Sequence, residues 1–299
     1  MKIWAGKMST RFSVIIPTYR NSDYLDLCLR SALAGQEEQN QILVVVDGFM
    51  NESIDVLNIH GKHPSVDVLE LPRNMGMQHA LNVGVFNADN EKVFIINDDN
   101  VFAKGWDSNL QLALLNGPNS VITVDQVEQS PSMFNFHVPY AGTGSFGSTP
   151  REFNFEKWIE YANSIKTLEQ TRNGHIFPFI INKSQYMAAG GFDTLYASPF
   201  ICDWDFFLKL ELSGIDFFRT HLTHMYHFGS SATKNGKEGQ RFKESEQIAW
   251  ETFKYKWGFN PYNEPGTNSK IPKRSLFGGP TEGPTGDIIK GINFASIKK

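Results

Sequence analysis

The sequence predicts an α/β protein with a mostly parallel central sheet flanked by helices, followed by a C-terminal helix and a Pro/Gly-rich tail. Short β-branched runs, among them Phe12–Pro17 and Ile42–Val46, alternate with amphipathic helical patterns over residues 12–125. Such alternation is typical of βαβ units with right-handed crossovers. The composition agrees, since hydrophobic residues make up 40% and charged residues 20% of the 299 positions, as in soluble globular proteins.

The first half of the chain follows this pattern without a break. Each expected strand is a short apolar run that ends at turn residues, and each expected helix carries an apolar stripe at helical spacing. Asn21 or Ser22 is placed to cap the first helix, and Gly35 ends it. After that helix we expect strands at Ile42–Val46, Val66–Leu71, the run from Val93, and Val121–Val124, with further helices at Met77–Asn87 and Lys104–Leu115.

The second half has a looser pattern. We expect helices at Phe155–Thr171, Phe200–Leu212 and Gln240–Trp257, and strands at Ile176–Ile181, Ile215–Phe218 and His221–Phe228. These patterns predict an N-terminal extension (1–11), a main domain (12–230, with halves 12–125 and 126–230) and a C-terminal region (231–299). The tail from Asn260 is rich in proline and glycine, so we expect it to be ordered only where it packs on the body or on another subunit of a homo-oligomer.

Charge and cysteine content narrow the class of protein. Lys and Arg total 28 against 32 Asp and Glu, a net charge of −4, which makes nucleic acid an unlikely partner. Cys28 and Cys202 both fall in apolar patterns, as reduced packing residues of a cytosolic protein do. The amino terminus lacks a signal-peptide core, and no apolar run approaches the ~20 residues of a membrane helix. We expect a cytoplasmic protein, at most peripheral to a membrane.

The stretch Val93–Val101 (VFIINDDNV) is the strongest candidate for a site. A buried strand leads into Asn97, Asp98 and Asp99, and ligands of open α/β sheets bind beyond the carboxyl ends of the strands. Alternation along an extended chain predicts that Asn97 and Asp99 share one face. Oxygen ligands there suit Mg²⁺ or Mn²⁺ holding phosphates. The alternative is a polar turn that caps the helix that follows.

Several further features stand in a fixed order around this stretch. FSVIIPTYRNSDYLDLCLRSAL opens the pattern, RNMGMQHALNVGV follows the third strand, and CDWDFFLKL comes after GGFD. This order resembles the family-2 glycosyltransferases, the inverting enzymes of the GT-A (nucleotide-diphospho-sugar transferase) fold, over residues 12–230. The single motifs are weak, and their order and spacing carry the resemblance.

The resemblance implies a role for each matched residue, and each also has a structural alternative. Asp47 would accept a hydrogen bond from a ring nitrogen of the nucleotide, and Asp98 would face the sugar or cap the next helix. Turn chemistry alone also explains Asp47, Thr18 and Tyr19. The nucleotide- and sugar-binding residues implied in this way are Pro17, Thr18, Tyr19, Asp47, Arg73, Asn74, Gly76 and Asp98.

The metal ligands implied by the resemblance are Asp99, Asn97 and His227. Asp99 matches the second Asp of the family's D-x-D, and Asn97 replaces the first with an uncharged oxygen ligand. His227 matches a position that can complete the coordination of Mn²⁺ or Mg²⁺. His221 and His224 are nearby competitors for that place.

The catalytic base implied by the resemblance is Asp203, with Asp205 as runner-up. Apolar neighbours would raise the pKa of Asp203 by partial desolvation. The alternative is a helix N-terminal turn enriched in acids that the helix dipole stabilises. Two departures from the family pattern are Cys202, where Glu is usual, and Leu81, where Arg is frequent.

The function implied is the metal-dependent transfer of a sugar from a nucleotide-diphosphate sugar, with UDP favoured, to a carbohydrate or other acceptor hydroxyl with inversion. A sugar nucleotidyltransferase is the first alternative, although PTYRNSD stands where its Gly-rich basic loop would follow the first strand. A degenerate, non-catalytic binding subunit is the second. Asn97, Leu81 and Cys202 favour that second alternative.

Overall fold

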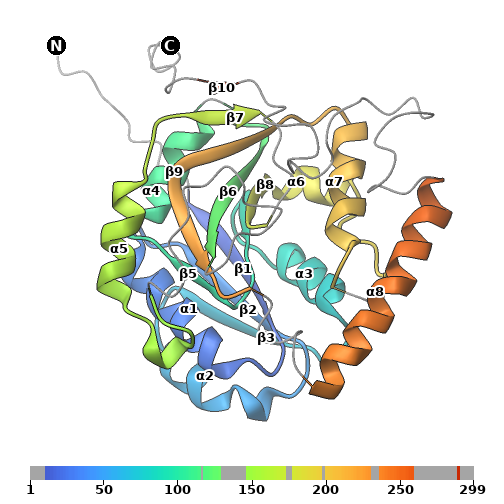
Figure 1. Ribbon diagram of the computed structural model, residues 1–299, viewed down its shortest axis with the longest axis horizontal. Helices are drawn as coiled ribbons and strands as arrows, with labels where there is room; N and C mark the ends of the chain where they lie inside the picture. Colours follow the sequence, from blue (N-terminus) through green and yellow to red (C-terminus); the bar gives the residue numbers. More distant parts are fainter. Residues whose placement is uncertain are drawn as a thin grey trace.

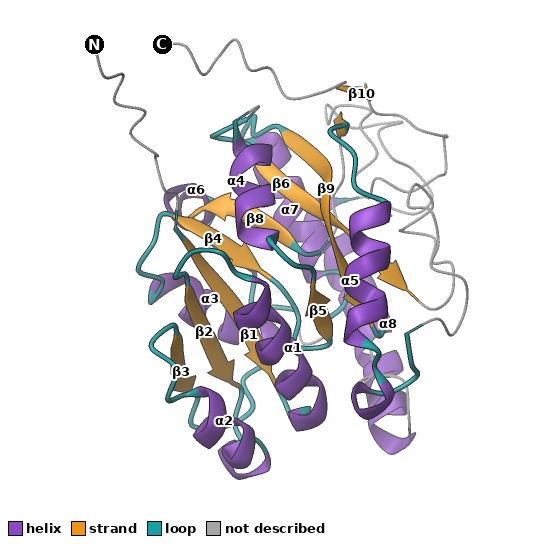
Figure 2. Ribbon diagram, turned by 90° about the vertical axis from the view of Figure 1, so that its left-hand side faces the viewer, coloured by secondary structure: helices purple, strands orange, loops and turns teal. Residues whose placement is uncertain are grey.

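The computed structural model describes residues 11–115, 117–128, 146–172, 177–196, 199–229, 236–258 and 288–289. A mixed β-sheet forms the centre of this structure, and helices cover both of its faces (Figures 1 and 2). Its strands run in the order β10-β7-β9-β6-β8-β4-β1-β2-β3, and β5 pairs with β9 beside this path. The predicted α/β class is confirmed.

The strands of the first half are parallel and those of the second half are mixed. β3, β2, β1 and β4 are parallel neighbours, whereas β8 is antiparallel to both β4 and β6. The parallel pattern stops where helical crossovers stop alternating with strands in the sequence. The strands are β1 (Phe12–Thr18), β2 (Gln41–Val46), β3 (Val66–Glu70), β4 (Lys92–Ile95), β5 (Asn100–Phe102), β6 (Val121–Glu128), β7 (Gln170–Arg172), β8 (Phe179–Asn182), β9 (Phe217–His227) and β10 (Ile288–Ile289).

The helices divide the apolar core into two layers, one on each face of the sheet. One layer joins α3, α7 and α8 to the sheet, and the other joins α1, α2 and α4. A smaller cluster forms beneath α5 around Trp158 and Tyr226. The helices are α1 (Ser22–Gly35), α2 (Ile54–His60), α3 (Met77–Phe86), α4 (Trp106–Leu114), α5 (Phe155–Ser164), α6 (Lys183–Ala188), α7 (Cys202–Leu212) and α8 (Gly236–Trp257), with 3-10 turns at η1 (Met50–Glu52) and η2 (Pro150–Glu152).

Most elements differ from their predicted bounds by a few residues, and the following differences bear on the sheet and the site. The helix expected to reach Thr171 ends at Ser164, and the two strands expected around residues 215–228 form the single strand β9. The strand from Val93 ends at Ile95, and β5 begins separately at Asn100. The polar run from Asn97 to Asp99 therefore lies between two strands.

The terminal regions lie largely outside the described residues. This holds for residues 1–10 of the expected N-terminal extension and for the tail after Gly258 except β10, so oligomerisation through the tail stays a prediction. Within the described ranges, no helix combines the length and apolar character needed to cross a bilayer.

Candidate active site

The carboxyl ends of β1, β2 and β4 bring the predicted nucleotide- and metal-site segments to one edge of the sheet. β1 is parallel to both β2 and β4, and Thr18 pairs with Val46 at the last position of the ladder. Asp47 follows β2, and the Asn97–Asp99 run follows β4. This meeting at one edge is what the sequence predicted from the strand pattern.

Asp47 braces the loop that precedes α3. Its carboxylate accepts hydrogen bonds from the backbone N–H of Met75 (2.6 Å) and of Gly76 (2.9 Å). Burial raises its pKa although these two N–H groups oppose the rise. Both oxygens are thus engaged with the backbone, so the direct contact with a nucleotide ring nitrogen is not supported. Asp47 shapes this edge of the sheet by holding the loop of residues 73–76 in place.

Gly48 allows this loop to approach the end of β2. Its φ is +74°, and a Cβ there would lie 2.6 Å from the backbone N of Asn74. Arg73 and Asn74 are exposed on the same loop, and the Asn74 side chain accepts a hydrogen bond from Gly76 N–H at 3.1 Å. The predicted loop residues therefore lie together at the sheet edge, and their contacts with a nucleotide stay a prediction.

Asp98 is a structural residue in this geometry, which corrects its predicted place. Its two oxygens accept hydrogen bonds from Thr18 Oγ1 (2.7 Å) and Asn21 Nδ2 (2.9 Å), and its side chain is buried. It caps no helix, because β5 follows, and each of its oxygens already accepts one hydrogen bond within the protein, so a contact with the sugar stays a prediction. Burial, followed by the charge of Asp99, raises its pKa to about 7. Asn21 is correspondingly not a side-chain cap of α1.

The strand alternation expected to pair Asn97 with Asp99 is also wrong. β4 ends at Ile95, and Asp98 and Asp99 lie in a turn, so the period of two does not extend to them. The turn, not the alternation, directs Asp98 and Asp99 apart. Asn97 is partly exposed, and its backbone carbonyl accepts a hydrogen bond from Asn100 Nδ2 (3.3 Å).

Asp99 faces His227 across the pairing of β5 with β9. Asn100 is the strand partner of His227, and Asp99 Oδ1 lies 3.4 Å from His227 Nε2. The other ring nitrogen, Nδ1, lies 2.6 Å from Glu128 Oε1. Burial lowers the pKa of His227, but the two carboxylates outweigh it and raise the pKa to about 10.

Without a cation this contact is an ion pair, and its spacing also fits two ligands of one ion once the imidazolium has released its proton. Ligand atoms at about 2.1 Å from a divalent cation are separated by about 3.0–3.4 Å for bond angles between octahedral and tetrahedral. The 3.4 Å between Asp99 Oδ1 and His227 Nε2 fits that range. Glu128 is placed to fix the ring orientation of His227, as carboxylates behind metal-binding histidines do. Glu128 was not predicted, although it lies at the polar end of β6.

The loops after β1 and β2 each contribute one ring to an aromatic pair at the same edge. Tyr19 and Phe49 meet edge to face at 5.8 Å, and the Arg20 guanidinium lies 4.4 Å from the centre of the Phe49 ring. Phe49 is 49% exposed and was not predicted. Pro17, in contrast, is buried inside β1 opposite Val45, so its predicted contact with the nucleotide is not supported.

The two candidate bases both lie at the start of α7 but differ in burial and in their hydrogen bonds. Asp203 is partly exposed, its Oδ1 accepts the backbone N–H of Trp204, and burial raises its pKa to about 6. Asp205 is fully buried, and its Oδ1 accepts hydrogen bonds from Trp257 Nε1 (2.7 Å) and Tyr196 Oη (3.1 Å). Asp205 is therefore held by the protein and is corrected to a structural role, while Asp203 stays the candidate base.

Gln78 links the start of α7 to the start of α3, next to the loop that Asp47 holds. Its side chain, in the first turn of α3, hydrogen-bonds Cys202, the first residue of α7. The same end of α3 follows the loop that Asp47 holds. The start of α7 therefore lies beside the part of the sheet edge formed by β2 and this loop.

A second polar cluster lies between β6 and β9 and was not predicted. Ligand-type atoms of Asp125, His221 and His224 lie within 4.8 Å of one another, at a register shift between Val124 and Asp125. Arg219 Nε lies 3.5 Å from Asp125 Oδ1, and Arg219 is only 2% exposed. This guanidinium neutralises Asp125 and would repel a cation bound beside it, so we interpret the cluster as a polar part of the core. Histidines three apart in HLTH were its signal in the sequence.

The fold and the site together define a glycosyltransferase of the GT-A fold: a sheet edge with an acidic turn after β4, and an acid on the helix that starts beside it. The chain belongs to the family described as "Glycosyl transferase family 2", which matches residues 13–178, more than half of its length. The resemblance inferred from the sequence is thereby confirmed. The match ends before α7 and β9, so the roles of Asp203 and His227 are not tested by it.

Known proteins similar to this chain belong to the same class. An uncharacterised glycosyltransferase of Haemophilus influenzae is 26% identical over 134 residues, which are 44% of this chain and 50% of that protein. The chain thus spans about half the length of this relative. The crystal structure of S. aureus TarS 1–349 aligns with a TM-score of 0.52 at 16% identity, over 88% of this chain and 76% of that one. The same protein in complex with UDP-GlcNAc aligns with a TM-score of 0.52 at 16% identity, over 85% and 74%. At this identity the two structures support the fold alone.

Proposed function

We propose that this protein transfers a sugar from a UDP-sugar to a carbohydrate or other acceptor hydroxyl, with inversion and with Mn²⁺ or Mg²⁺. The observation that carries the proposal is the facing pair of Asp99 Oδ1 and His227 Nε2, 3.4 Å apart at the sheet edge, with Glu128 behind the imidazole. A carboxylate is the kind of ligand that Mn²⁺ and Mg²⁺ prefer, and the imidazole becomes a second ligand when the cation displaces its proton.

The nucleotide is assigned to the edge formed by the loops after β1, β2 and β3. The partly exposed rings of Tyr19 and Phe49 offer apolar faces, and the exposed Arg73 offers a positive charge for phosphate. UDP is favoured among nucleotides because the similar fold of TarS has been solved with UDP-GlcNAc.

Asp99 and His227 would hold the cation, and Asn97, in the same segment between β4 and β5, is the further oxygen ligand that the sequence proposes. A bound Mn²⁺ or Mg²⁺ supplies positive charge to the diphosphate that departs. The residues prepare the site for it: Glu128 orients the imidazole, and Asp98 fixes the turn by holding Thr18 and Asn21. The residues that hold the cation are thus already in place before negative charge develops on the departing diphosphate.

Asp203 is assigned as the base that takes the proton of the acceptor hydroxyl. The acceptor oxygen then bonds to the anomeric carbon as the bond from that carbon to the diphosphate oxygen breaks, and attack from the opposite side inverts the configuration. A carboxylate with a pKa of about 6 is ionised at neutral pH yet more basic than an ordinary aspartate. Both properties suit a general base.

The alternative that one observation favours is a non-catalytic subunit that binds nucleotide sugars. The acid usual at position 202 is a buried cysteine here, with its thiol directed to the carbonyl of Pro199 at 3.3 Å. Such a subunit would bind UDP in a metal-dependent way without consuming donors.

A donor-hydrolysis assay with a panel of nucleotide sugars and Mn²⁺ separates the two. We expect hydrolysis of one donor class by the wild-type protein, loss of it in Asp203→Asn, and no loss in Asp55→Asn, a control on the exposed side of α2. Metal-dependent binding of UDP without hydrolysis of any donor would instead establish the binding subunit. Hydrolysis unchanged by Asp203→Asn would remove the base from this mechanism.

A further inference from the structure

The last helix of the described chain, α8, packs against the helix that carries the candidate base. Ala249 and Phe253 of α8 belong to the same core layer as Phe206 and Phe207 of α7. The rings of Trp250 and Trp204 meet edge to face at 5.0 Å. Figure 1 shows both helices on the same side of the sheet. α8 lies beyond residues 13–178 of the family match and outside the domain predicted at 12–230.

The last turn of α8 places two donors on the buried carboxylate of Asp205. Lys256 Nζ and Trp257 Nε1 each lie 2.7 Å from Asp205 Oδ1. Lys256 also lies 2.6 Å from Asp193 Oδ2, so one ammonium joins α7 to the turn that precedes it. Burial lowers the pKa of Lys256, but its hydrogen bonds to Asp193 and Asp205 outweigh burial and raise it.

Asp205 depends on these donors, together with Tyr196 Oη at 3.1 Å, because it is fully buried. The nearest cation on its own helix, Lys209, lies 3.7 Å from Oδ2, beyond hydrogen-bond distance. A buried charge that loses its partners is costly, and the surrounding structure shifts to regain water or other donors. The position of the first turn of α7 is therefore tied to the end of α8.

That first turn also carries Asp203. It begins from Ile201 in a left-handed conformation (φ 71°), and Asp205 N–H closes the turn on the Ile201 carbonyl at 3.1 Å. Asp203 lies inside the turn that this hydrogen bond closes. A shift of Asp205 therefore displaces the backbone of Asp203.

We propose that Lys256 and Trp257 are positioning residues for the transfer reaction, which hold Asp203 in place through Asp205. The inference rests on the proposed function for its catalytic part, because Asp203 is assigned there as the base. It makes α8 a required part of the catalytic unit. Neither residue needs to touch a substrate.

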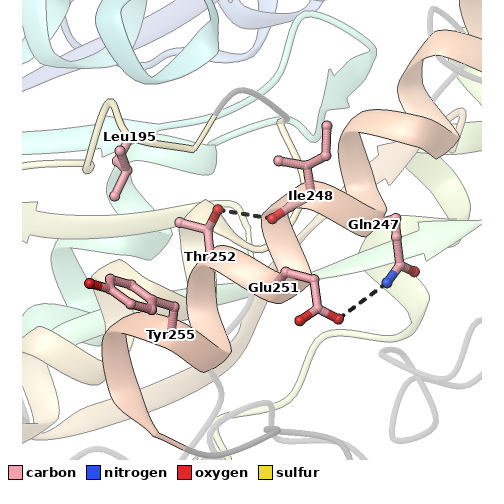
Figure 3. A pocket seen from close by; sticks show the side chains of 6 residues that line it. All are labelled: Leu195, Gln247, Ile248, Glu251, Thr252 and Tyr255. Atoms are coloured by element: carbon pink, nitrogen blue, oxygen red, sulfur yellow. Dashed lines mark hydrogen bonds between the residues drawn. The ribbon is translucent and has the colours of Figure 1, made fainter.

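The matched variants are Trp257→Phe, which removes the indole N–H and keeps a ring, and Tyr255→Ala as control. Tyr255 is 91% exposed two residues away and lines an open surface depression with Leu195 and Ile248 (Figure 3). Lys256→Met and Lys256→Arg form a second pair, since Arg keeps the charge at Asp205.

The first measurement is hydrogen exchange of residues 202–212, followed by mass spectrometry, which needs no activity. We expect faster exchange in Trp257→Phe and Lys256→Met, and wild-type exchange in Tyr255→Ala and Lys256→Arg. Exchange unchanged in Trp257→Phe and Lys256→Met would overturn the proposal at its structural step. If these two variants exchange faster but the wild-type protein consumes no donor, the structural step holds and the proposed function has failed.

The second measurement is the pH profile of kcat. A misplaced base lowers kcat, by up to about 10²-fold for a displacement near 1 Å, while KM for the donor stays unchanged. The acidic limb of the profile should also move to lower pH than in the wild type, because water that reaches Asp203 lowers its pKa. A lower kcat with an unmoved limb would mean that these residues only keep the protein folded, and it would overturn the positioning role.

Discussion

Replacing Asp203 by Asn should abolish turnover and at the same time stabilise the protein. Asn keeps the shape of the side chain and can still accept the backbone N–H of Trp204, but it cannot take a proton. We expect kcat to fall about 10²–10⁴-fold, which is the usual contribution of a positioned general base. UDP binding should survive, because the nucleotide edge lies on the other half of the domain.

The stability change follows from the pKa of Asp203, which burial raises from 3.8 to about 6. A difference of about two pKa units corresponds to at most about 3 kcal/mol, and partial exposure of the side chain reduces this to about 1–2 kcal/mol. The folded protein binds this proton more tightly than the unfolded chain. The contribution of Asp203 to stability is therefore fully present below pH 4 and is lost as the pH rises through 6. Asn does not titrate, so the stability of the variant relative to the wild type should increase as the pH rises from 4 to 7.

Urea unfolding at several pH values checks this reasoning. The free energies of unfolding of variant and wild type should converge near pH 4 and differ by about 1–2 kcal/mol at pH 7. Asp205→Asn is the control with the opposite sign, since it breaks a buried ion pair and should cost about 2–4 kcal/mol. A gap that does not change between pH 4 and 7 would refute the desolvation of Asp203, and near-normal turnover in Asp203→Asn would refute its role as base.

Three further substitutions test the proposed cation site in the turn after β4. Asp99→Ala should reduce the affinity for UDP with Mn²⁺, measured by calorimetry, to its value with EDTA; equal wild-type affinity in both conditions would contradict the metal role. Asn97→Asp should tighten Mn²⁺ at a fixed UDP concentration, because it adds a charged ligand; an unchanged Mn²⁺ affinity would place Asn97 outside the coordination. Asp98→Ala should affect transfer less than Asp99→Ala but leave Thr18 and Asn21 without their acceptor, at a cost of about 1–3 kcal/mol in urea unfolding. An unfolding free energy equal to that of the exposed control Asp55→Ala would show that Asp98 does not brace the turn.

The sequence was sufficient for the first half of the fold because each strand there is followed by a helix with its own apolar stripe. It was insufficient for β8, whose antiparallel place between β4 and β6 depends on pairing and not on the pattern of residues 179–182. The same limit applies to the proposed cation site. Alternation was extended four residues too far, from Ile95 to Asp99, because nothing in VFIINDDNV marks Ile95 as the last strand residue.

The two candidate bases show why some side-chain roles cannot be read from local sequence. Asp203 and Asp205 look equivalent in CDWDFFLKL, and both follow GGFD. What separates them is Trp257 and Lys256, fifty residues later, which bind Asp205 and leave Asp203 partly exposed. Contacts of such long range are set by packing of the whole domain.

The pairing of β5 with β9 has a consequence for how the protein is made. Asp99 and Glu128 both emerge early during synthesis, whereas His227 follows much later, and β9 must pair with β5 and β6 before its imidazole meets the two carboxylates. A growing chain therefore lacks the His227 contact of Asp99 through most of its translation and gains it only when β9 joins the sheet. Fragments that end before β9 should accordingly lack the site, however well their parallel strands fold.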